Sequence, residues 1–284
     1  MMTIDPQEVS LGKLHNHLLS GIGPRPIAFA STVDKNGKRN LSPFSYFNVF
    51  STRPPIAIFS PAKSGRTNTQ KNTYENAKET MEVVINVVNY NIVQQMSLSS
   101  TAYAKGVDEF IKSGLTPLES QLVKPARVKE SPIQLECKVK EIVELGDEGG
   151  SGNLIICEIL LIHIDDAILT DEGTIDTKKI DLVGRMGGDF YVRAFGDALF
   201  EVPKPIRQLG IGVDQLPEKI RNSSILTGND LGMLGNVESL PNDQEVKAFA
   251  DHFEVANGWE EKQRQAQGFL KQSKIDEAWK ILLS

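Results

Sequence analysis

The familiar sequence signatures of catalysis are missing from this chain. Gly210 and Gly212 are two apart, but Gln215 stands where a G-x-G-x-x-G fingerprint needs its third glycine. The 284 residues also contain no Walker A sequence, no G-x-S-x-G elbow and no H-E-x-x-H pair. These absences argue against a Rossmann nicotinamide site, a P-loop nucleotide site, a hydrolase of the elbow type and a helical zinc site. The chemistry is therefore expected to come from a bound group.

Cysteine, long apolar runs and excess positive charge are also scarce. Cys137 and Cys157 are the only cysteines and lack C-x-x-C spacing, so two buried, reduced thiols are expected, with a disulfide or redox pair as the alternative. The longest apolar run, 154–164, is interrupted by Glu158 and is too short to cross a bilayer. The formal net charge of −6 argues against a nucleic-acid backbone as partner.

Two further signals are weak. The N-terminal residues lack the apolar core of a secretory signal, so a cytoplasmic location is expected. His15 and His17 are two residues apart but have no nearby set of cysteines or acids, so no metal site is expected.

The chain is organised around residues 23–62. The apolar runs 27–33 and 56–60 are predicted as the first and third of three strands, and the second, within 40–48, is joined to the first as a hairpin through a Gly-containing turn at 34–37. The segment 40–48 between them mixes small polar with aromatic side chains. Such a mixture suits a surface that faces a flat, partly polar ligand better than it suits a pure core.

Further strand-like runs predict a mainly β, α+β fold. These runs are 82–88, 133–145 and 153–165, and the helices predicted between them are short. Asn72 is expected to cap one helix, with Glu75 completing a capping box. Six or so strands with short connecting helices favour an antiparallel barrel over a doubly wound sheet.

The composition changes near residue 203, and helices are predicted from there to the C-terminus. Their ranges are 214–222, 229–234, 242–257, 259–272 and a last helix from Ser273; Asn242 is the expected cap of the third, with Gly258 just past its end. The chain is accordingly divided into a barrel domain, 1–200, and a C-terminal helical extension, 201–284.

Several motifs in order carry a family resemblance. P-R-P-I-A-F-A-S-T-V-D, N-L-S-P-F-S-Y-F-N and R-P-P-I-A-I-F-S lie within 24–60, and K-N-T-Y-E-N and V-G-R-M-G-G-D-F-Y follow at 71–76 and 183–191. Together they resemble the flavin reductase-like family of FMN-binding split barrels, of the flavoredoxin type. The resemblance covers residues 20–195 and implies an FMN-binding split β-barrel with short connecting helices.

FMN carries a dianionic phosphate, and a helix N-terminus with nearby cations suits such a group. Arg66, Lys71, Asn72 and Thr73 lie at or before the helix predicted from residue 72, so they are candidates for phosphate binding; simple capping with a solvated Lys71 is the alternative. Ser42 and Ser45 are candidates for the phosphate or ribityl oxygens, or else are turn hydroxyls that bond their own backbone.

The resemblance also implies contacts to the flavin ring. These fall on Ser31, Thr32, Phe47, Asn48 and Ser60, with core packing as the alternative for Phe47. Arg25 matches a position near the cofactor, or else forms a surface salt bridge. Arg185 and Tyr191 are expected to close the site from a later loop, where Gly187 and Gly188 are alternatively only a tight turn.

The implied activity is that of an FMN-dependent oxidoreductase. NAD(P)H would reduce the bound flavin, FAD is a less favoured cofactor, and electrons would pass to a flavin or another acceptor. The flavin would carry the chemistry, so no catalytic side chain is predicted, and a homodimer is expected. The alternatives are an FMN-binding electron carrier without reductase turnover and a non-flavin binding module on the same scaffold. The extension after residue 200 is expected to change which substrate the protein accepts more than it changes FMN binding.

Overall fold

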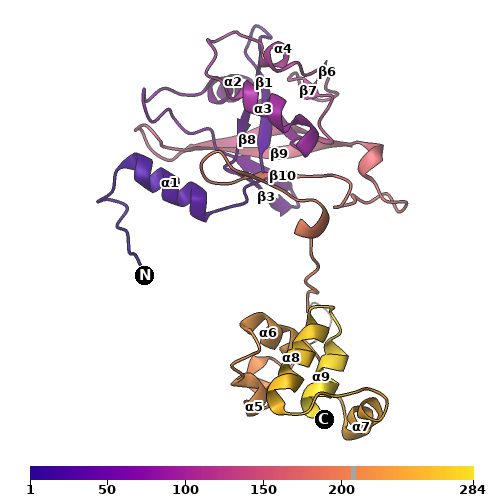
Figure 1. Cartoon of the computed structure of the whole chain (residues 1–284). Coiled ribbons are helices and arrows are strands. Elements are labelled where there is room, and N and C mark those ends of the chain that lie inside the picture. Colours follow the sequence, from indigo (N-terminus) through magenta and orange to yellow (C-terminus); the bar gives the residue numbers. More distant parts are fainter. Residues whose placement is uncertain (206–208) are drawn as a thin grey trace. The chain divides into compact units, whose positions relative to one another are not determined.

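The computed structural model describes residues 1–205 and 209–284, which form two compact units, 1–200 and 201–284 (Figure 1). One antiparallel sheet of seven strands dominates the first unit, in the order β2-β1-β5-β8-β9-β4-β3. The strands are β1 (Ala28–Val33), β2 (Arg39–Phe44), β3 (Phe47–Thr52), β4 (Pro55–Phe59), β5 (Glu82–Val87), β8 (Ile133–Glu144) and β9 (Asn153–Ile164).

The sheet curls around an apolar interior. Ala28 and Ala30 of β1 point into one buried cluster together with residues of β4, β5, β8 and β9, while Phe29 belongs to a second cluster on the opposite face. This alternation is the two-residue period of a strand. Phe44 of β2 reaches Phe59 of β4 across the interior, with ring centroids 5.6 Å apart. The end strands β2 and β3 therefore approach each other around the core although they are not neighbours in the sheet, as in a split barrel.

The segment 40–48 differs from its prediction. It contributes to two strands, β2 and β3, separated by Ser45 and Tyr46, so residues 27–60 form four strands rather than three. The turn is stabilised by Ser60, whose N–H donates to the carbonyl of Tyr46 at 2.9 Å.

Short helices cover the second cluster. α3 (Val93–Ser99) and α4 (Glu109–Ser113) pack there through Met96 and Phe110. The other elements of this unit are α1 (Leu11–Gly21), α2 (Asn72–Thr80), η1 (Tyr90–Ile92), β6 (Pro117–Leu118), β7 (Arg127–Val128), η2 (Asp166–Ile168), β10 (Val183–Arg185), β11 (Tyr191–Arg193) and η3 (Gly196–Ala198). β10 and β11 form a separate hairpin.

The two cysteines are free and buried on β8 and β9, as predicted. Burial raises the pKa of the Cys137 thiol to about 12 and raises the pKa of the Cys157 thiol well above its usual value. Both thiols therefore stay protonated, which makes them poor nucleophiles.

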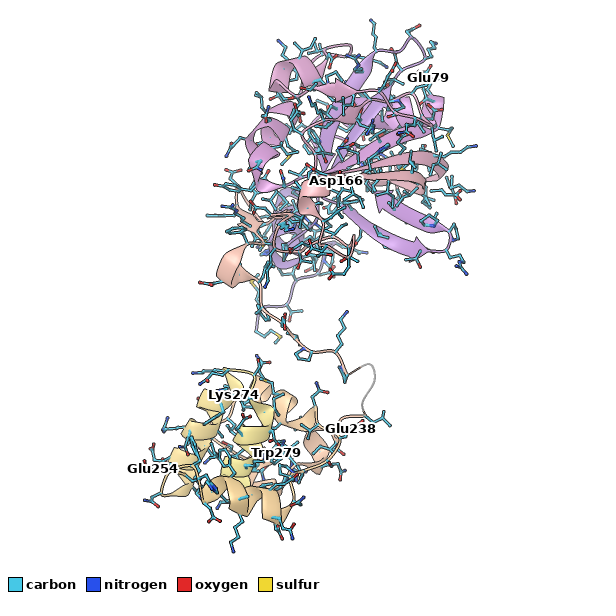
Figure 2. All side chains as sticks on the ribbon, turned by 90° about the vertical axis from the view of Figure 1, so that its right-hand side faces the viewer. Glu79, Asp166, Glu238, Glu254, Lys274 and Trp279 are labelled. Carbon is cyan, nitrogen blue, oxygen red and sulfur yellow. The ribbon has the colours of Figure 1, made fainter. Side chains whose placement is uncertain are left out.

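The second unit is helical and has its own core. Its elements are η4 (Val213–Gln215), α5 (Glu218–Arg221), α6 (Gly228–Gly235), α7 (Asp243–Ala250), α8 (Trp259–Leu270) and α9 (Ile275–Leu283). Trp279 lies inside this unit, 1% exposed, and its indole N–H donates to the Leu234 carbonyl at 3.1 Å (Figure 2). The buried cluster around it is drawn from residues 211–283.

The capping and turn residues in the sequence predicted the ends of these helices only in part. The capping box of Asn242 and Glu245 is confirmed, as both of its hydrogen bonds are present. The helix it starts ends at Ala250 rather than near 257, and Gly258 caps the start of α8 instead of following the end of α7. Pro217 separates η4 from α5, which replace the single helix predicted over 214–222.

No helix within the described ranges is both long and apolar enough to span a membrane.

Candidate functional site

The N-terminus of α2 is not capped as predicted. Lys71, with extended backbone angles of φ −82° and ψ 146°, is the N-cap residue, and Asn72 is already helical. Glu75 pairs instead with Lys105 at 2.5 Å, so the predicted capping box between Asn72 and Glu75 is wrong. The first N–H groups of a helix have no intrahelical acceptor. In α2 these groups belong to Asn72, Thr73 and Tyr74.

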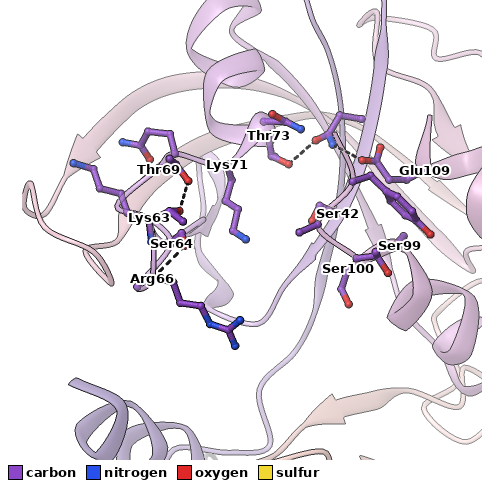
Figure 3. A pocket seen from close by; sticks show the side chains of 18 residues that line it. Ser42, Lys63, Ser64, Arg66, Thr69, Lys71, Thr73, Ser99, Ser100 and Glu109 are labelled. Atoms are coloured by element: carbon purple, nitrogen blue, oxygen red, sulfur yellow. Dashed lines mark hydrogen bonds between the residues drawn. The ribbon is translucent and has the colours of Figure 1, made fainter. Parts of the chain in front are cut away.

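A cavity of about 650 Å³, here called the basic cavity, opens at this helix end (Figure 3). It is lined by three segments that are distant in sequence. They are the segment 63–71 with the start of α2, strand β2 at Asn40 and Ser42, and residues 99–103 at the C-terminal end of α3; Glu109 of α4 also lines the cavity. The four predicted phosphate residues Arg66, Lys71, Asn72 and Thr73 therefore lie at one cavity with Ser42.

Positive charge faces this cavity without a balancing partner. Among the described residues, neither Arg66 nor Lys71 has a carboxylate within ion-pair distance, and both side chains extend into the space opposite Ser42 and Ser100 (Figure 3). Lys63 is engaged, because its ammonium group donates to the Asp147 carbonyl at 3.0 Å. Two unpaired cations, free helix N–H groups and surrounding hydroxyls are the donor set that a phosphate requires.

A buried polar network supports one wall of the basic cavity. Glu109, 4% exposed, accepts hydrogen bonds from Asn40 Nδ2 at 3.1 Å and from the N–H of Leu41 at 3.0 Å. Asn40 Oδ1 in turn accepts from Thr73 Oγ1 at 2.7 Å (Figure 3). Burial raises the pKa of Glu109. Since the Thr73 hydroxyl already donates to Asn40, only its backbone N–H is free to donate to an anion.

A second cavity of about 430 Å³, here called the hairpin cavity, shares Ser100 with the first. The β10–β11 hairpin supplies Arg185, Asp189 and Tyr191, and the Arg185 guanidinium lies 4.7 Å from the centroid of the Tyr191 ring. The opposite walls are formed by Ile27, Pro43, Phe44, Ser45, Met96 and Ser97. The structure thus brings the predicted residues Ser45, Arg185 and Tyr191 to one cavity next to the basic one, with apolar, aromatic and polar side chains in its walls.

Arg25 lies behind the hairpin cavity. It is 6% exposed and donates to Ser45 Oγ at 3.3 Å, to the Met186 carbonyl at 3.1 Å and to the carbonyls of Leu19 and Ile22 at the end of α1. No carboxylate among the described residues pairs with it, so the alternative of a surface salt bridge is wrong. Burial lowers the pKa of this guanidinium. Arg25 positions Ser45 and the hairpin rather than lining the cavity.

The other predicted ring contacts lie outside both cavities. Ser31 and Thr32 are fully buried because β1 is an interior strand covered on both faces, and the Ser31 hydroxyl has no hydrogen-bond partner within the described part of the chain. Phe47 packs against the interior cluster, Asn48 Oδ1 accepts from the N–H of Val49 at 2.8 Å, and Ser60 is buried. A role of these five residues in flavin binding stays a prediction.

Sequence reasoning missed much of the polar lining. The missed residues are Asn40, Lys63, Ser64, Thr67, Thr69, Ser97, Ser99, Ser100, Thr101, Glu109 and Asp189. The run S-G-R-T-N-T-Q-K at 64–71 was a usable signal, because small hydroxyl residues before a helix favour anion binding. No local signal marked residues 97–101, since their place beside the other segments is set by how α3 packs on the sheet.

The fold and the cavities define a class of protein, the split barrel with a cavity at a helix N-terminus, and comparison with known proteins names the family. Residues 21–176 match the flavin reductase like domain, and the chain belongs to this family of flavin-related oxidoreductases. An uncharacterized protein of Aquifex aeolicus is 36% identical over 189 residues, which are 66% of this chain and 94% of that protein.

Solved structures agree in fold. Component B of nitrilotriacetate monooxygenase from Bacillus cereus is 27% identical with a TM-score of 0.66, over 71% of this chain and 98% of that one. A flavin reductase candidate with a split barrel domain, from Shewanella frigidimarina NCIMB 400, is 28% identical with a TM-score of 0.60, over 72% of this chain and all of that one. Each match accounts for nearly the whole relative but leaves more than a quarter of this chain unmatched.

Proposed function

We propose that the first unit binds FMN, with the phosphate in the basic cavity and the flavin ring toward the adjoining hairpin cavity. One observation carries the proposal: Arg66 and Lys71 face the basic cavity with no carboxylate partner in residues 1–205 and 209–284, beside the free N–H groups that begin α2. The two adjoining cavities suit the two chemical halves of the ligand, since one is cationic and the other combines apolar and aromatic side chains with polar ones, as a flat ring with a polar edge requires. The sequence motifs favour FMN over FAD as the cofactor.

The chain's own residues would bind and orient the cofactor. Ser42 lines the basic cavity and Ser45 lines the hairpin cavity, so both can offer hydroxyls to the ribityl chain, while Arg25 holds Ser45 by a hydrogen bond. Tyr191, backed by Arg185, offers an aromatic face to the ring. When bound, FMN would supply the redox chemistry by taking a hydride from NAD(P)H, releasing NAD(P)⁺ and passing two electrons to a flavin or another acceptor.

Two alternatives share this fold. An FMN-binding electron carrier would keep the cofactor but would not oxidise NAD(P)H in steady state. A non-flavin binding module would leave both cavities to another ligand. The unpaired cations at a helix N-terminus favour a phosphate ligand and so favour the first two candidates over the third.

The experiment that tests FMN binding is a titration of the purified protein. Quenching of flavin fluorescence with one equivalent of FMN, and visible absorbance retained after gel filtration, are expected. A protein that is colourless after gel filtration, although it was incubated with excess FMN, would exclude both flavin functions. Oxidation of NADH or NADPH with added flavin then separates a reductase from a carrier.

We also propose that the protein is a homodimer. Val49 and Phe50 on the edge strand β3 are 51% and 65% exposed, and Leu160 and Ile162 of β9 are 40% and 51% exposed. Large exposed apolar side chains on an edge strand and on the face of a sheet favour an interface between copies. Sedimentation equilibrium that returns the monomer mass of 31.3 kDa would contradict a dimer. The cytoplasmic location stays a prediction.

Glu109→Gln is expected to strengthen FMN binding several-fold, about 1 kcal/mol. The variant removes a negative charge from the wall of a cavity proposed to hold a phosphate. The amide oxygen can still accept from Asn40, whereas the N–H of Leu41 then faces the amide NH2 group and loses its acceptor. The measurement is a fluorescence titration with FMN and with riboflavin, which has no phosphate; riboflavin affinity should not change. A weaker affinity for FMN alone would show that the carboxylate supports the phosphate site through Asn40.

A further inference from the structure

The segment 61–70, here called the cavity loop, contributes most of its residues to the wall of the basic cavity and leads into the N-cap residue of α2. It closes on itself through two hydrogen bonds of 2.9 Å, from the N–H of Ser64 to the Thr69 carbonyl and from the N–H of Asn68 to the Ser64 carbonyl. Asn68 has a positive φ of 53°, a conformation that asparagine tolerates well in turns. The loop therefore has a defined shape of its own.

The cavity loop is attached to the connection between β8 and β9. The N–H of Lys63 donates to the Ser151 carbonyl at 2.9 Å, and the N–H of Gly150 donates to the Lys63 carbonyl at 3.1 Å. A Cβ placed on Gly152 would lie 2.7 Å from Ser60 Oγ, so the missing side chain lets the start of β9 come close to the residue before the loop. The position of the loop is thus set by the first residues of β9.

Asn153, the first residue of β9, holds both ends of the cavity loop. Its side chain is fully buried, and its Nδ2 group donates to the carbonyl of Pro61 at 2.8 Å and to Oε1 of Gln70 at 2.9 Å. A backbone carbonyl can only accept, so Pro61 determines that the NH2 end of the Asn153 amide faces the loop. The atom of Gln70 that meets the same NH2 group must then be its amide oxygen.

The Asn153 amide is kept at this position although one of its atoms is unsatisfied. Its Oδ1 atom is buried and has no hydrogen-bond partner within the residues that the structure describes. A buried acceptor without a partner destabilises the folded state, and an apolar side chain of similar size would avoid this loss. A buried asparagine is explained here if its two donors have a function at the wall of the basic cavity.

The amide of Gln70 has its donor group free at this wall. Gln70 is half-buried and lines the basic cavity. Its oxygen is occupied by Asn153, and its Nε2 group donates to no acceptor in residues 1–205 and 209–284. An amide NH2 group carries two N–H donors, which is the chemistry that a phosphate oxygen accepts. The chain of contacts from Pro61 through Asn153 therefore leaves Gln70 in the orientation that an anion requires.

We propose that Gln70 is a further phosphate ligand of the basic cavity and that Asn153 is the positioning residue that orients it. The inference rests on the proposed function, because the anion is the FMN phosphate assigned to this cavity. Gln70 adds a neutral donor to the cations Arg66 and Lys71. A cation attracts an anion over a distance of several ångströms, whereas an amide acts only within hydrogen-bond distance, so Gln70 fixes where the phosphate lies.

The first test compares Gln70→Ala with Gln121→Ala in fluorescence titrations with FMN and with riboflavin. Gln121 is an exposed glutamine that lines neither the basic cavity nor the hairpin cavity, so its replacement is the matched control. Gln70→Ala is expected to weaken FMN binding about tenfold or more and to change riboflavin binding by less than about twofold. Gln121→Ala should change neither affinity.

Two results would count against the inference in different ways. Unchanged or tighter FMN binding in Gln70→Ala, in a parent protein that binds FMN, overturns the inference alone. Failure of the parent protein to bind FMN overturns the proposed function, and the inference with it.

The second test addresses the positioning role with Asn153→Leu, since leucine is similar in size and offers no donor. This variant is expected to weaken FMN binding about fivefold in the parent protein, but less than about twofold in the Gln70→Ala background, which has no amide to orient. An equal loss in both backgrounds overturns the positioning role. If Asn153→Leu does not fold, Asn153→Ser is compared in the same two backgrounds, because one hydroxyl donor cannot hold both Pro61 and Gln70.

Discussion

Replacing both Arg66 and Lys71 by alanine is expected to weaken FMN binding by about 3–6 kcal/mol, or two to four orders of magnitude in Kd. Each charge-assisted hydrogen bond to a phosphate is worth about 1.5–3 kcal/mol. Both cations face the basic cavity, and no carboxylate that the structure describes pairs with either of them. Either single variant should show about half of the loss.

Two comparisons isolate the phosphate as the cause. Riboflavin lacks the phosphate, so its affinity should be the same for the parent protein and the double variant. A second double variant, Lys129→Ala with Lys138→Ala, removes the same charge from two exposed positions outside both cavities and should bind FMN normally. If the control variant loses as much affinity as the test variant, the effect is one of net charge and the assigned phosphate site is wrong.

Glu136→Ala is expected to lower the free energy of unfolding of the first unit by about 3–5 kcal/mol. The side chain of Glu136 is fully buried on β8. Its carboxylate accepts from the N–H groups of Gln121 and Leu122 at 2.8 and 2.6 Å, and lies 2.7 Å from His163 Nε2. Removing the carboxylate leaves these part-buried donors without their acceptor, which costs more than the loss of one exposed ion pair.

The measurement is urea unfolding followed by far-ultraviolet circular dichroism. Tryptophan fluorescence is unsuitable for the first unit, because Trp259 and Trp279 are the only tryptophans and both lie in the second. Glu141→Ala, an exposed glutamate on the same strand, is the matched control and should change stability by less than about 0.5 kcal/mol. Equal stabilities of the two variants would contradict the role given to Glu136.

The effect of Glu136 should depend on pH in a defined direction. Burial alone would raise the pKa of this carboxyl, but the hydrogen bonds from Gln121, Leu122 and His163 outweigh it and lower the pKa. A lowered folded-state pKa contributes stability that is present above the unfolded value of about 4.3 and is lost as the pH falls through the folded value. The difference between Glu136→Ala and the parent protein should therefore shrink below about pH 4.

Much of the barrel could be predicted from local pattern. The runs 82–88, 133–145 and 153–165 each became a strand, because alternation and β-branched residues act within a few positions. Prediction was weaker where a turn or cap decided the outcome. Ser45 and Tyr46 divide the segment 40–48 into two strands, and the helix predicted to end near 257 ends at Ala250.

The site was predicted only in part, for a physical reason. Arg66, Lys71, Asn72 and Thr73 are close in sequence, so any helix beginning near residue 72 gathers them. Ser31 and Thr32 have the same polar character, but the sheet places them on a central strand where both faces are covered. Burial of a strand on both faces depends on its neighbours in the sheet and cannot be read from the strand itself.

By itself the sequence determined the family, the change of composition near residue 203 and the cations at the start of α2. These features depend only on residue identity and short-range order. The tertiary structure alone decided that β2, the 63–71 loop and the end of α3 meet around one cavity. It also decided that residues of α3 line two further cavities, one of which includes Tyr90. Those segments are far apart in the chain. They are brought together by the pairing order of the sheet and by the packing of α3 against it, which are long-range interactions that no local pattern encodes.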